Sequence, residues 1–266
     1  MIGSAAIIAR IDKKGKPMSL TFLDLKDIAE REIELVNPTS PEKIVTIGRV
    51  AGMAPGQRVI EFGCGYAEPL VLWAENFGLA GVGVDLRPNT IDRARLKIAE
   101  RGLSGQLRVF QGKGAEFPHE PGSFDYASCI GASFVWENLD EALQALKRAI
   151  KPGGKILLGE VYWLKDKVPP ELIESQPSIH SEAGLLKLFR KAELEVEYIL
   201  HSSVDDWDRY ETANWHGLIT WMKENPLDPD LAAVVQHLHE SQDEYILYGR
   251  EYFGWALYLL SPADFG

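Results

Sequence analysis

Residues 59–65, Val-Ile-Glu-Phe-Gly-Cys-Gly, decide the fold. An apolar strand runs into a glycine turn, and a helical pattern over 67–77 follows. Glycines in such a turn let the backbone approach a ligand, and the helix N-terminus offers unpaired N–H groups to an anionic group such as a carboxylate or phosphate. The alternative is a tight strand–helix connection without a ligand.

Short apolar runs alternate with amphipathic helical patterns along the next hundred residues, which is typical of a parallel sheet covered by helices. Seven runs predict strands, and six amphipathic segments before the last two strands predict helices. The strands are expected at 58–62, 81–86, 107–111, 124–130, 155–160, 194–202 and 254–260, and the helices at 22–35, 40–50, 67–77, 88–101, 138–150 and 181–191. Residues 205–248, rich in Trp and Tyr, read as a mostly helical insertion between the last two strands.

Composition is that of an ordinary globular protein, with 266 residues, 45% hydrophobic residues and 25% charged residues. The formal net charge of −11 disfavours nucleic acid as a partner, because phosphate binding needs clustered Lys and Arg. No stretch approaches the roughly 18 apolar residues of a membrane span. A short apolar run over Ala5–Ala9 is followed, not preceded, by Lys residues, so it does not resemble a signal peptide. We therefore expect a cytoplasmic protein that partners neither membrane nor nucleic acid.

The two cysteines are Cys64 in the glycine turn and Cys129 on an apolar strand. They are too few for a disulfide framework or a four-cysteine zinc site, and packed free thiols are the better interpretation. His237 and His239 lie two residues apart on a predicted helix and point to different faces, so no metal site is predicted.

Asp85 closes the second predicted strand, 20 residues after Gly65. At that spacing a carboxylate can accept hydrogen bonds from both hydroxyls of a ribose. The alternative role for Asp85 is to cap the following helix. Together the turn and the acid indicate an adenosine-containing cofactor at the carboxyl ends of the strands.

Glu68 stands where a dinucleotide fingerprint requires a small residue. A carboxylate there would repel a pyrophosphate, so NAD and FAD are disfavoured. A zwitterionic amino-acid tail on a sulfonium tolerates nearby acids, and Glu61 fits that interpretation.

The chain resembles the class I S-adenosylmethionine-dependent methyltransferases over nearly all of its length. The resemblance rests on an ordered set of motifs, and the later ones resemble a largely uncharacterised bacterial branch of small-molecule methyltransferases. These motifs are E-F-G-C-G (61–65), G-V-D (83–85), Q-G-K-G-A-E (111–116), G-S-F-D (122–125), C-I-G-A-S (129–133), K-P-G-G-K-I (151–156), G-E-V-Y-W (159–163), W-D-R-Y-E-x-A-x-W (207–215) and R-E-Y-F-G-W (250–255).

The resemblance implies an α/β fold: a Rossmann-like, seven-stranded, mostly parallel sheet with one antiparallel strand and helices on both faces. It divides the chain into four parts. N-terminal helices in 1–56 would pack on or cover the cofactor site, 57–204 would form the S-adenosylmethionine-binding core, 205–250 would be an aromatic insertion over the acceptor, and 251–266 would supply the final strand.

The resemblance also implies which residues bind S-adenosyl-L-methionine. Glycines of the turn would line its methionine end with Glu61, the acid after the second strand would hold the ribose, and residues after the third and fourth strands would border the adenine and the methionine portion. The set is Glu61, Gly63, Gly65, Asp85, Leu86, Gly114, Ala115, Ile130 and Gly131. Many members carry an acid where Lys113 stands; because a lysine cannot accept the adenine amino group, we expect a nearby backbone carbonyl or Glu116 to do so.

The resemblance implies that the methyl acceptor lies after the fourth and fifth strands, near Ser133, Trp136, Glu160 and Tyr162. Glu160 is the best candidate for a catalytic base, with Tyr162 beside it, because burial at the end of an apolar strand raises a carboxyl pKa. The alternative is that Glu160 orders a loop.

Aromatic residues of the insertion extend this acceptor site. Tyr210, Trp215 and His216 are its candidate substrate contacts, although a stripe of rings on one helix face is also typical of a core.

Three functions follow in order of preference. The first is transfer of a methyl group to a small-molecule acceptor, the second is a non-catalytic S-adenosylmethionine-binding module, and the third is a nicotinamide-dependent oxidoreductase. The aromatic insertion favours the enzyme, because it supplies a pocket for an acceptor.

Overall fold

The computed structural model describes residues 20–263, and its centre is one eight-stranded sheet. Seven strands follow the order β3-β2-β1-β4-β5-β8-β7, and the two-residue β6 pairs with β5 beside this path. The strands are β1 (Arg58–Phe62), β2 (Ala80–Asp85), β3 (Leu107–Gln111), β4 (Phe124–Ile130), β5 (Ile150–Trp163), β6 (His180–Ser181), β7 (Leu194–His201) and β8 (Phe253–Pro262).

Only β8 runs against the other strands of this path, being antiparallel to both β5 and β7, whereas β1 to β5 pair in parallel. This confirms the predicted α/β fold class, with a mostly parallel sheet, one antiparallel strand and a helical insertion between the last two strands. The additional β6 escaped prediction because two residues are too short for any periodic pattern.

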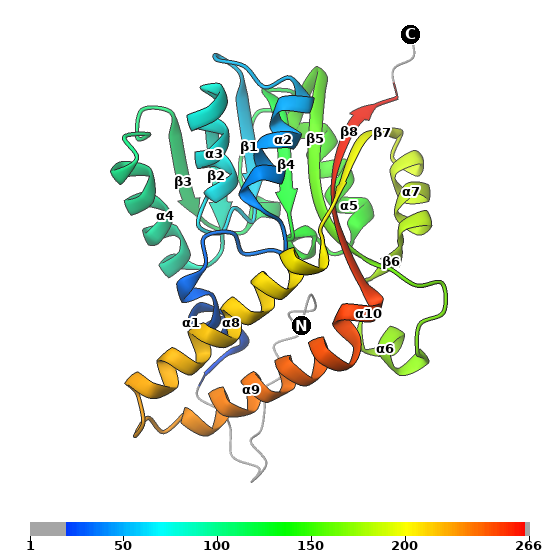
Figure 1. The fold of residues 1–266 in the computed structure, drawn as a ribbon. Helices are drawn as coiled ribbons and strands as arrows, with labels where there is room; N and C mark the ends of the chain where they lie inside the picture. The colour runs from blue at the N-terminus through cyan, green and yellow to red at the C-terminus, as the bar shows by residue number, and fades with distance from the viewer. Residues whose placement is uncertain (1–19, 264–266) are drawn as a thin grey trace.

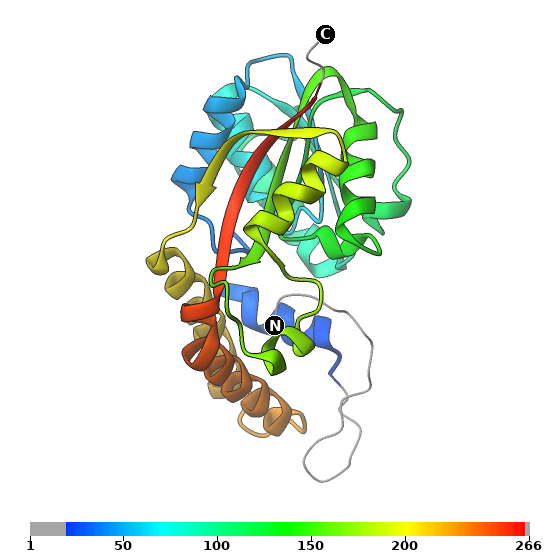
Figure 2. The same cartoon turned by 90° about the vertical axis from the view of Figure 1, so that its right-hand side faces the viewer.

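Helices cover both faces of the sheet, as Figure 2 shows from the side. One face packs against α2 (Pro41–Ala51), α3 (Glu68–Phe77) and α4 (Pro88–Glu100), and the other against α5 (Leu139–Ala149) and α7 (Glu182–Lys191). Each face has its own apolar cluster, with Trp73 fully buried in the first and Phe189 in the second. Because both faces are covered, the central strands are apolar on both sides.

Apart from the short helical turns η2 (Gly114–Glu116) and η3 (Ser133–Val135), which follow β3 and β4, the remaining helices form a cap at the end of the sheet to which the parallel strands point (Figure 1). The cap comprises α1 (Phe22–Ala29), η1 (Glu30–Glu32), α6 (Pro170–Ser175), α8 (Val204–Glu224), α9 (Leu231–Glu244), the π-turn η4 (Tyr245–Gly249) and α10 (Arg250–Tyr252). Its own apolar cluster joins α1 to α8 and α9 through Leu25, Leu218 and Val234. In parallel sheets, ligands bind at this carboxyl edge.

Two predicted elements differ from the structure. The helix expected over 22–35 ends at residue 32. The guanidinium of Arg93 donates hydrogen bonds to the backbone carbonyls of Arg31 and Ile33, both at 2.8 Å, so these carbonyls are not free to continue the helix. The strand expected over 155–160 begins earlier and ends later, since β5 includes residues 151–154, where the Lys151 ammonium binds the Asp125 carboxylate at 2.8 and 2.9 Å beside an irregularity in the β4–β5 register.

Among helices in the described range, none is both long and apolar enough to cross a membrane. The apolar run over Ala5–Ala9 lies outside the described residues.

Gly217 of α8 sets the distance between α8 and α1, and we predict that Gly217→Ala lowers the free energy of unfolding by about 1–3 kcal/mol. A Cβ at this position would lie 2.3 Å from the carbonyl oxygen of Ala29 and 3.0 Å from that of Ile28. This clash outweighs the gain of about 0.5–1 kcal/mol that alanine brings to a helix interior. Urea unfolding is the measurement.

Gly105→Ala is the matched control, because nothing lies within 4 Å of a Cβ built there. Its unfolding free energy should stay within about 0.5 kcal/mol of the wild type. A Gly217→Ala protein as stable as this control would contradict the close helix contact.

Candidate active site

The glycine turn after β1 is held against the end of β2 by backbone hydrogen bonds. The N–H groups of Gly63 and Cys64 both donate to the carbonyl of Val84, at 2.8 and 3.0 Å. Gly63 and Gly65 have φ of +69° and +53°, a region open to glycine, and Ala67 adopts φ of +58° at the start of α3. A non-glycine residue at positive φ stores strain, which is common where a turn serves a ligand.

Asp85 completes this anchorage with its side chain. One carboxylate oxygen accepts from the Gly65 N–H at 3.0 Å, and the other accepts from the Arg87 N–H at 3.0 Å. The carboxylate is 11% exposed, and each oxygen keeps further acceptor capacity. Asp85 therefore orders both the turn and the start of α4, while its position at the carboxyl end of β2 also suits the ribose role predicted for it.

Close packing surrounds the turn, so side chains larger than hydrogen have no room there. A Cβ on Gly63 would lie 2.1 Å from the Cβ of Ala132, and a Cβ on Gly65 would lie 2.7 Å from Val36. A Cβ on Gly131, whose φ is +77°, would lie 2.9 Å from the Trp255 ring. The loops after β1 and β4 thus meet the irregular segment 33–40, which packs over them.

Two buried oxygens near this turn lack hydrogen-bond partners within the described residues: Oε2 of Glu61 and Oδ1 of Asn37. Glu61 is 1% exposed, and its other oxygen is 3.5 Å from the Ser128 hydroxyl. Burial raises the pKa of Glu61 well above its usual range. Asn37 lies beside Gly131, with its Cβ 3.6 Å from a Cβ built on that glycine. Buried acceptors without partners need an explanation, and a donor-bearing ligand is one.

Glu160 lies near the carboxyl end of β5 with Ser133 beside it. One carboxylate oxygen accepts from the Val161 N–H at 3.1 Å, and the other is buried without a partner in residues 20–263. Burial raises the pKa of Glu160 to about 7, although a hydrogen bond with Ser133 opposes the shift. A carboxyl group that titrates near neutral pH is suited to proton transfer.

The other predicted cofactor residues surround the same edge of the sheet. Gly114 and Ile130 are buried, whereas Leu86 is 51% exposed and Ala115 is also exposed. The Lys113 ammonium pairs with the Glu116 carboxylate at 2.9 Å on the surface. Glu116, which is expected to accept the adenine amino group because Lys113 cannot, therefore lies beside Lys113.

The structure divides the predicted acceptor residues into two groups. Ser133 and Trp136 lie near the loop after β4, where Trp136 packs edge-on against Phe62 at 5.2 Å, and Tyr162 is buried against His201. Burial, with Glu182 nearby, raises the pKa of Tyr162 to about 12.

The insertion residues lie in the cap instead. Tyr210 faces Lys26 of α1, whose ammonium is 3.4 Å from the Tyr210 hydroxyl. Trp215 donates its indole N–H to the Ser241 hydroxyl of α9 at 3.0 Å, and His216 is exposed on α8.

Asn37 and Arg87 were missed by the sequence interpretation. Asn37 precedes Pro38 and lies between the two helices predicted over 22–35 and 40–50, outside every motif that the sequence offers. The guanidinium of Arg87 lies 2.7 Å from Glu30, 3.1 Å from Asp27 and 3.8 Å from Asp85, linking α1 to the turn.

Two further sequence interpretations concern thiols and acids. Both cysteines are free and buried, as predicted. Glu68, the acid that disfavoured a pyrophosphate, pairs with Lys97 at 2.7 Å. In the range 20–263, no group of three or more His, Cys, Asp or Glu side chains is placed to hold a metal ion.

Comparisons with known proteins extend over the sheet and the cap. A family model described as a methyltransferase domain matches residues 59–154. The uncharacterized protein YjhP of Escherichia coli (strain K12) is 31% identical over 238 residues, which cover 88% of this chain and 96% of YjhP. A SAM-dependent methyltransferase from Thiobacillus denitrificans, crystallised in complex with S-adenosyl-L-homocysteine, shares 29% identity and a TM-score of 0.84, covering 90% of this chain and 98% of that one. The corresponding Geobacter sulfurreducens complex has the same identity and TM-score.

We predict that Glu160→Gln removes a pH-dependent loss of stability. Because the folded pKa of about 7 lies above the ordinary value of 4.5, the folded protein binds this proton more tightly. The stabilisation that the protonated Glu160 carboxyl contributes is complete below pH 4.5 and falls as the pH rises through 7. The free energy of unfolding of Glu160→Gln, minus that of the wild type, should therefore rise by on the order of 2–3 kcal/mol between pH 5 and pH 8.

Urea unfolding at pH 5, 6.5 and 8 measures this difference. Glu137→Gln, which removes an exposed carboxylate, controls for the loss of one charge. A Glu160→Gln difference that does not change with pH would show that Glu160 is not held neutral by burial.

Proposed function

Since this chain belongs to the class I S-adenosylmethionine-dependent methyltransferases, we propose that it binds S-adenosylmethionine at the glycine turn and methylates a small organic acceptor. The observation that carries the proposal is the pair of buried oxygens of Glu61 and Asn37, which have no hydrogen-bond partner within residues 20–263 and lie beside a turn too tight for side chains. The related proteins crystallised with S-adenosyl-L-homocysteine support the choice of ligand.

The residues at the turn fit the amino-acid end of this cofactor. An α-ammonium group has three N–H donors, and Glu61 and Asn37 offer oxygens that need donors. Burial favours the neutral form of Glu61 in the free protein, because it raises the pKa of this carboxyl well above its usual range. An ammonium beside it would favour the carboxylate form, since an opposite charge lowers a carboxyl pKa.

Asp85 is the proposed ribose ligand. Its oxygens already hold the backbone of Gly65 and Arg87, so the carboxylate is fixed in place before a ligand arrives. A fixed acceptor loses little side-chain freedom on binding, which strengthens each hydrogen bond it makes. Leu86, Gly114 and Ala115 would border the adenine.

When bound, S-adenosylmethionine would supply a methyl group on a sulfonium: the methyl–sulfur bond breaks as the acceptor takes the methyl group, and the bonding electron pair stays on sulfur, which leaves as the neutral thioether of S-adenosyl-L-homocysteine. The chain must then align the acceptor, exclude water and remove the acceptor's proton. We assign the proton to Glu160: the acceptor's O–H or N–H bond breaks as the acceptor takes the methyl group, and the proton passes to the carboxylate. Ser133 lies beside Glu160 and favours its charged form, because it opposes the rise in the pKa of that carboxyl. The segment 33–40, packed over the turn, excludes water.

Asp85→Asn is predicted to weaken binding of S-adenosyl-L-homocysteine by about 1.5–3 kcal/mol, a ten- to hundred-fold rise in Kd. The reason is the loss of a charged acceptor for the ribose hydroxyls. Isothermal titration calorimetry measures the Kd. Asp92→Asn, which changes a 70% exposed carboxylate on the following helix, is the control and should bind as the wild type does. An unchanged Kd in folded Asp85→Asn would remove the ribose role.

Glu61→Gln is predicted to discriminate between two ligands that share adenosine. Its affinity for S-adenosyl-L-homocysteine should fall about ten-fold, because a neutral amide replaces the acceptor for the ammonium. Its affinity for 5′-methylthioadenosine, which lacks the amino-acid tail, should stay the same. An equal loss for both ligands would place Glu61 away from the tail.

The proposal as a whole is tested by titrating wild-type protein with S-adenosylmethionine and S-adenosyl-L-homocysteine. Saturable binding of both is expected, and absence of binding would contradict it. Tight binding without methyl transfer to any of a broad panel of acceptors would favour the non-catalytic module instead.

A further inference from the structure

A buried hydrogen bond joins the last strand of the chain to the segment 33–40, which packs over the glycine turn. The indole N–H of Trp255, on β8, donates to the Thr39 hydroxyl at 2.8 Å, across 216 positions of sequence. Both residues are buried, Trp255 with 2% of its surface exposed and Thr39 with 0%. Separating two such partners leaves both of them unpaired away from water, so the bond favours a single arrangement of the groups around it.

Thr39 holds Asn37 through the backbone. The Thr39 N–H donates to the Asn37 carbonyl at 2.9 Å, across the intervening Pro38. Such a three-residue turn is short, and the proline ring fixes the φ angle at its centre. Asn37 is 4% exposed, and its Oδ1 is the buried acceptor that has no hydrogen-bond partner in the part of the chain that the structure describes. The direction of this acceptor therefore depends on where Thr39 is held.

The ring of Trp255 reaches Asn37 from the side of the sheet. A Cβ built on Gly131 would lie 2.9 Å from this ring and 3.6 Å from the Asn37 Cβ. A Cβ built on Gly159 of β5 would lie 3.0 Å from the same ring. The two glycines are themselves joined, since the Gly131 N–H donates to the Gly159 carbonyl at 2.9 Å. The indole thus fills the space that side chains at both glycine positions would need, and Asn37 lies next to it.

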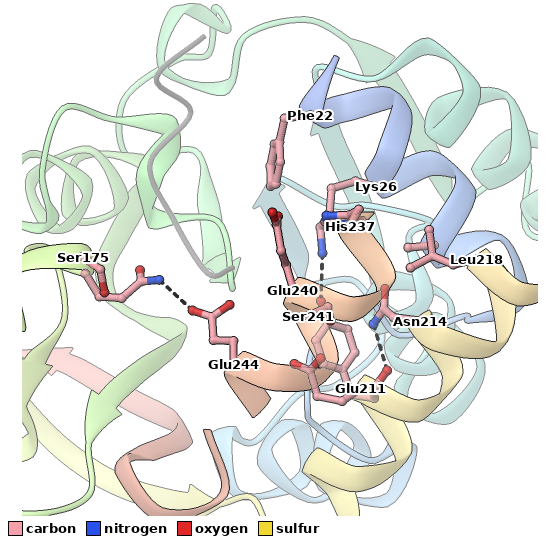
Figure 3. Close-up of a pocket in the computed structure, with 13 residues that line it drawn as sticks. Phe22, Lys26, Ser175, Glu211, Asn214, Leu218, His237, Glu240, Ser241 and Glu244 are labelled. Atoms are coloured by element: carbon pink, nitrogen blue, oxygen red, sulfur yellow. Dashed lines mark hydrogen bonds between the residues drawn. The ribbon is translucent and has the colours of Figure 1, made fainter. Parts of the chain in front are cut away.

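The carbonyl of Thr39 is bound from the cap. The guanidinium of Arg209, on α8, donates to it at 2.7 Å. Further along α8, Glu211, Asn214 and Leu218 line a cavity of about 330 Å³ inside the cap (Figure 3). Each polar group of Thr39 therefore has a hydrogen bond: the N–H within its own turn, the hydroxyl with β8, and the carbonyl with the helix that borders this cavity.

We propose that Thr39 and Trp255 are positioning residues for S-adenosylmethionine: their hydrogen bond aims the Asn37 amide oxygen at the α-ammonium group of the cofactor. This role rests on the proposed function, in which Glu61 and Asn37 accept hydrogen bonds from that ammonium. Thr39 and Trp255 bind each other and act on the cofactor through Asn37. An acceptor that is fixed before the ligand arrives loses little further freedom on binding, so its hydrogen bond contributes more to the affinity.

The alternative is that the bond between Thr39 and Trp255 stabilises the fold and does nothing else. Loss of such a bond would lower the fraction of folded protein, which changes the apparent affinity for every ligand of the site by the same factor. A bond that aims Asn37 affects only ligands that carry the amino-acid tail. Two adenosine ligands, one with the tail and one without it, therefore distinguish the two roles.

The test is calorimetric titration of the full-length protein with S-adenosyl-L-homocysteine and with 5′-methylthioadenosine, which lacks the tail. Thr39→Val keeps the shape of the side chain and removes the acceptor for the indole N–H. Its Kd for S-adenosyl-L-homocysteine should rise about five- to ten-fold, while its Kd for 5′-methylthioadenosine stays within about two-fold of the wild type. Thr39→Ser, which keeps the hydroxyl, should bind both ligands as the wild type does. So should the control Thr212→Val, which changes an exposed threonine of α8.

Trp255→Phe removes the same hydrogen bond from its other end, and it guards against a Thr39→Val protein that fails to fold. The same difference between the two ligands is expected for it. An unchanged Kd for S-adenosyl-L-homocysteine in a folded variant, or an equal rise for both ligands, would overturn the inference.

A double variant shows whether the bond acts through Asn37. Asn37→Ala alone should raise the Kd for S-adenosyl-L-homocysteine about ten-fold, because it removes the acceptor itself. If Thr39 acts by aiming that acceptor, adding Thr39→Val to Asn37→Ala causes no further loss. Losses that multiply in the double variant would show that Thr39 acts by another route and would overturn the assignment.

The same titrations separate this inference from the proposed function. If the wild type does not bind S-adenosyl-L-homocysteine, the methyltransferase proposal fails and the positioning role fails with it. If the wild type binds it and both Thr39→Val and Trp255→Phe bind it equally well, the methyltransferase proposal stands and the positioning role is wrong.

Discussion

The structure depends on the way the glycine turn after β1 is fastened to the end of β2. Val84 accepts two backbone N–H groups of the turn, and Asp85 accepts a third together with the N–H of Arg87, the residue before α4. These bonds join two neighbouring parallel strands and the two helices that follow them. With the turn held, its tight packing and the buried oxygens of Glu61 and Asn37 are fixed in place, so the ligand that we propose for them would bind without first ordering a loop.

Ionic contacts extend this rigidity into the cap. The Arg87 guanidinium forms ion pairs with Asp27 and Glu30. The Arg93 guanidinium donates hydrogen bonds to backbone carbonyls of the segment after α1, and it lies 4.0 Å from the centre of the Tyr66 ring. Glu30 is 3% exposed, and a charge buried to that degree is tolerated only when it is paired. The ion pairs of Arg87 therefore join the cap to the residues around the turn, and the cap and the turn share one framework.

The sequence predicted the sheet and its turn well, because those signals act over a few residues: an apolar run, then glycines, then an acid after the next strand. It did not predict the partners of the aromatic insertion. Tyr210 meets Lys26 across 184 positions, and Trp215 meets Ser241 of the next helix, so their surroundings depend on how helices pack. Asn37 was missed for the same reason, since its burial arises only when the segment 33–40 folds over the turn.

The most direct measurement is a crystal structure of the protein with S-adenosyl-L-homocysteine. The account predicts the ribose hydroxyls within hydrogen-bond distance of the Asp85 carboxylate and the amino group beside Glu61 and Asn37. A ligand bound elsewhere, or one that leaves both carboxyl groups untouched, would contradict the account.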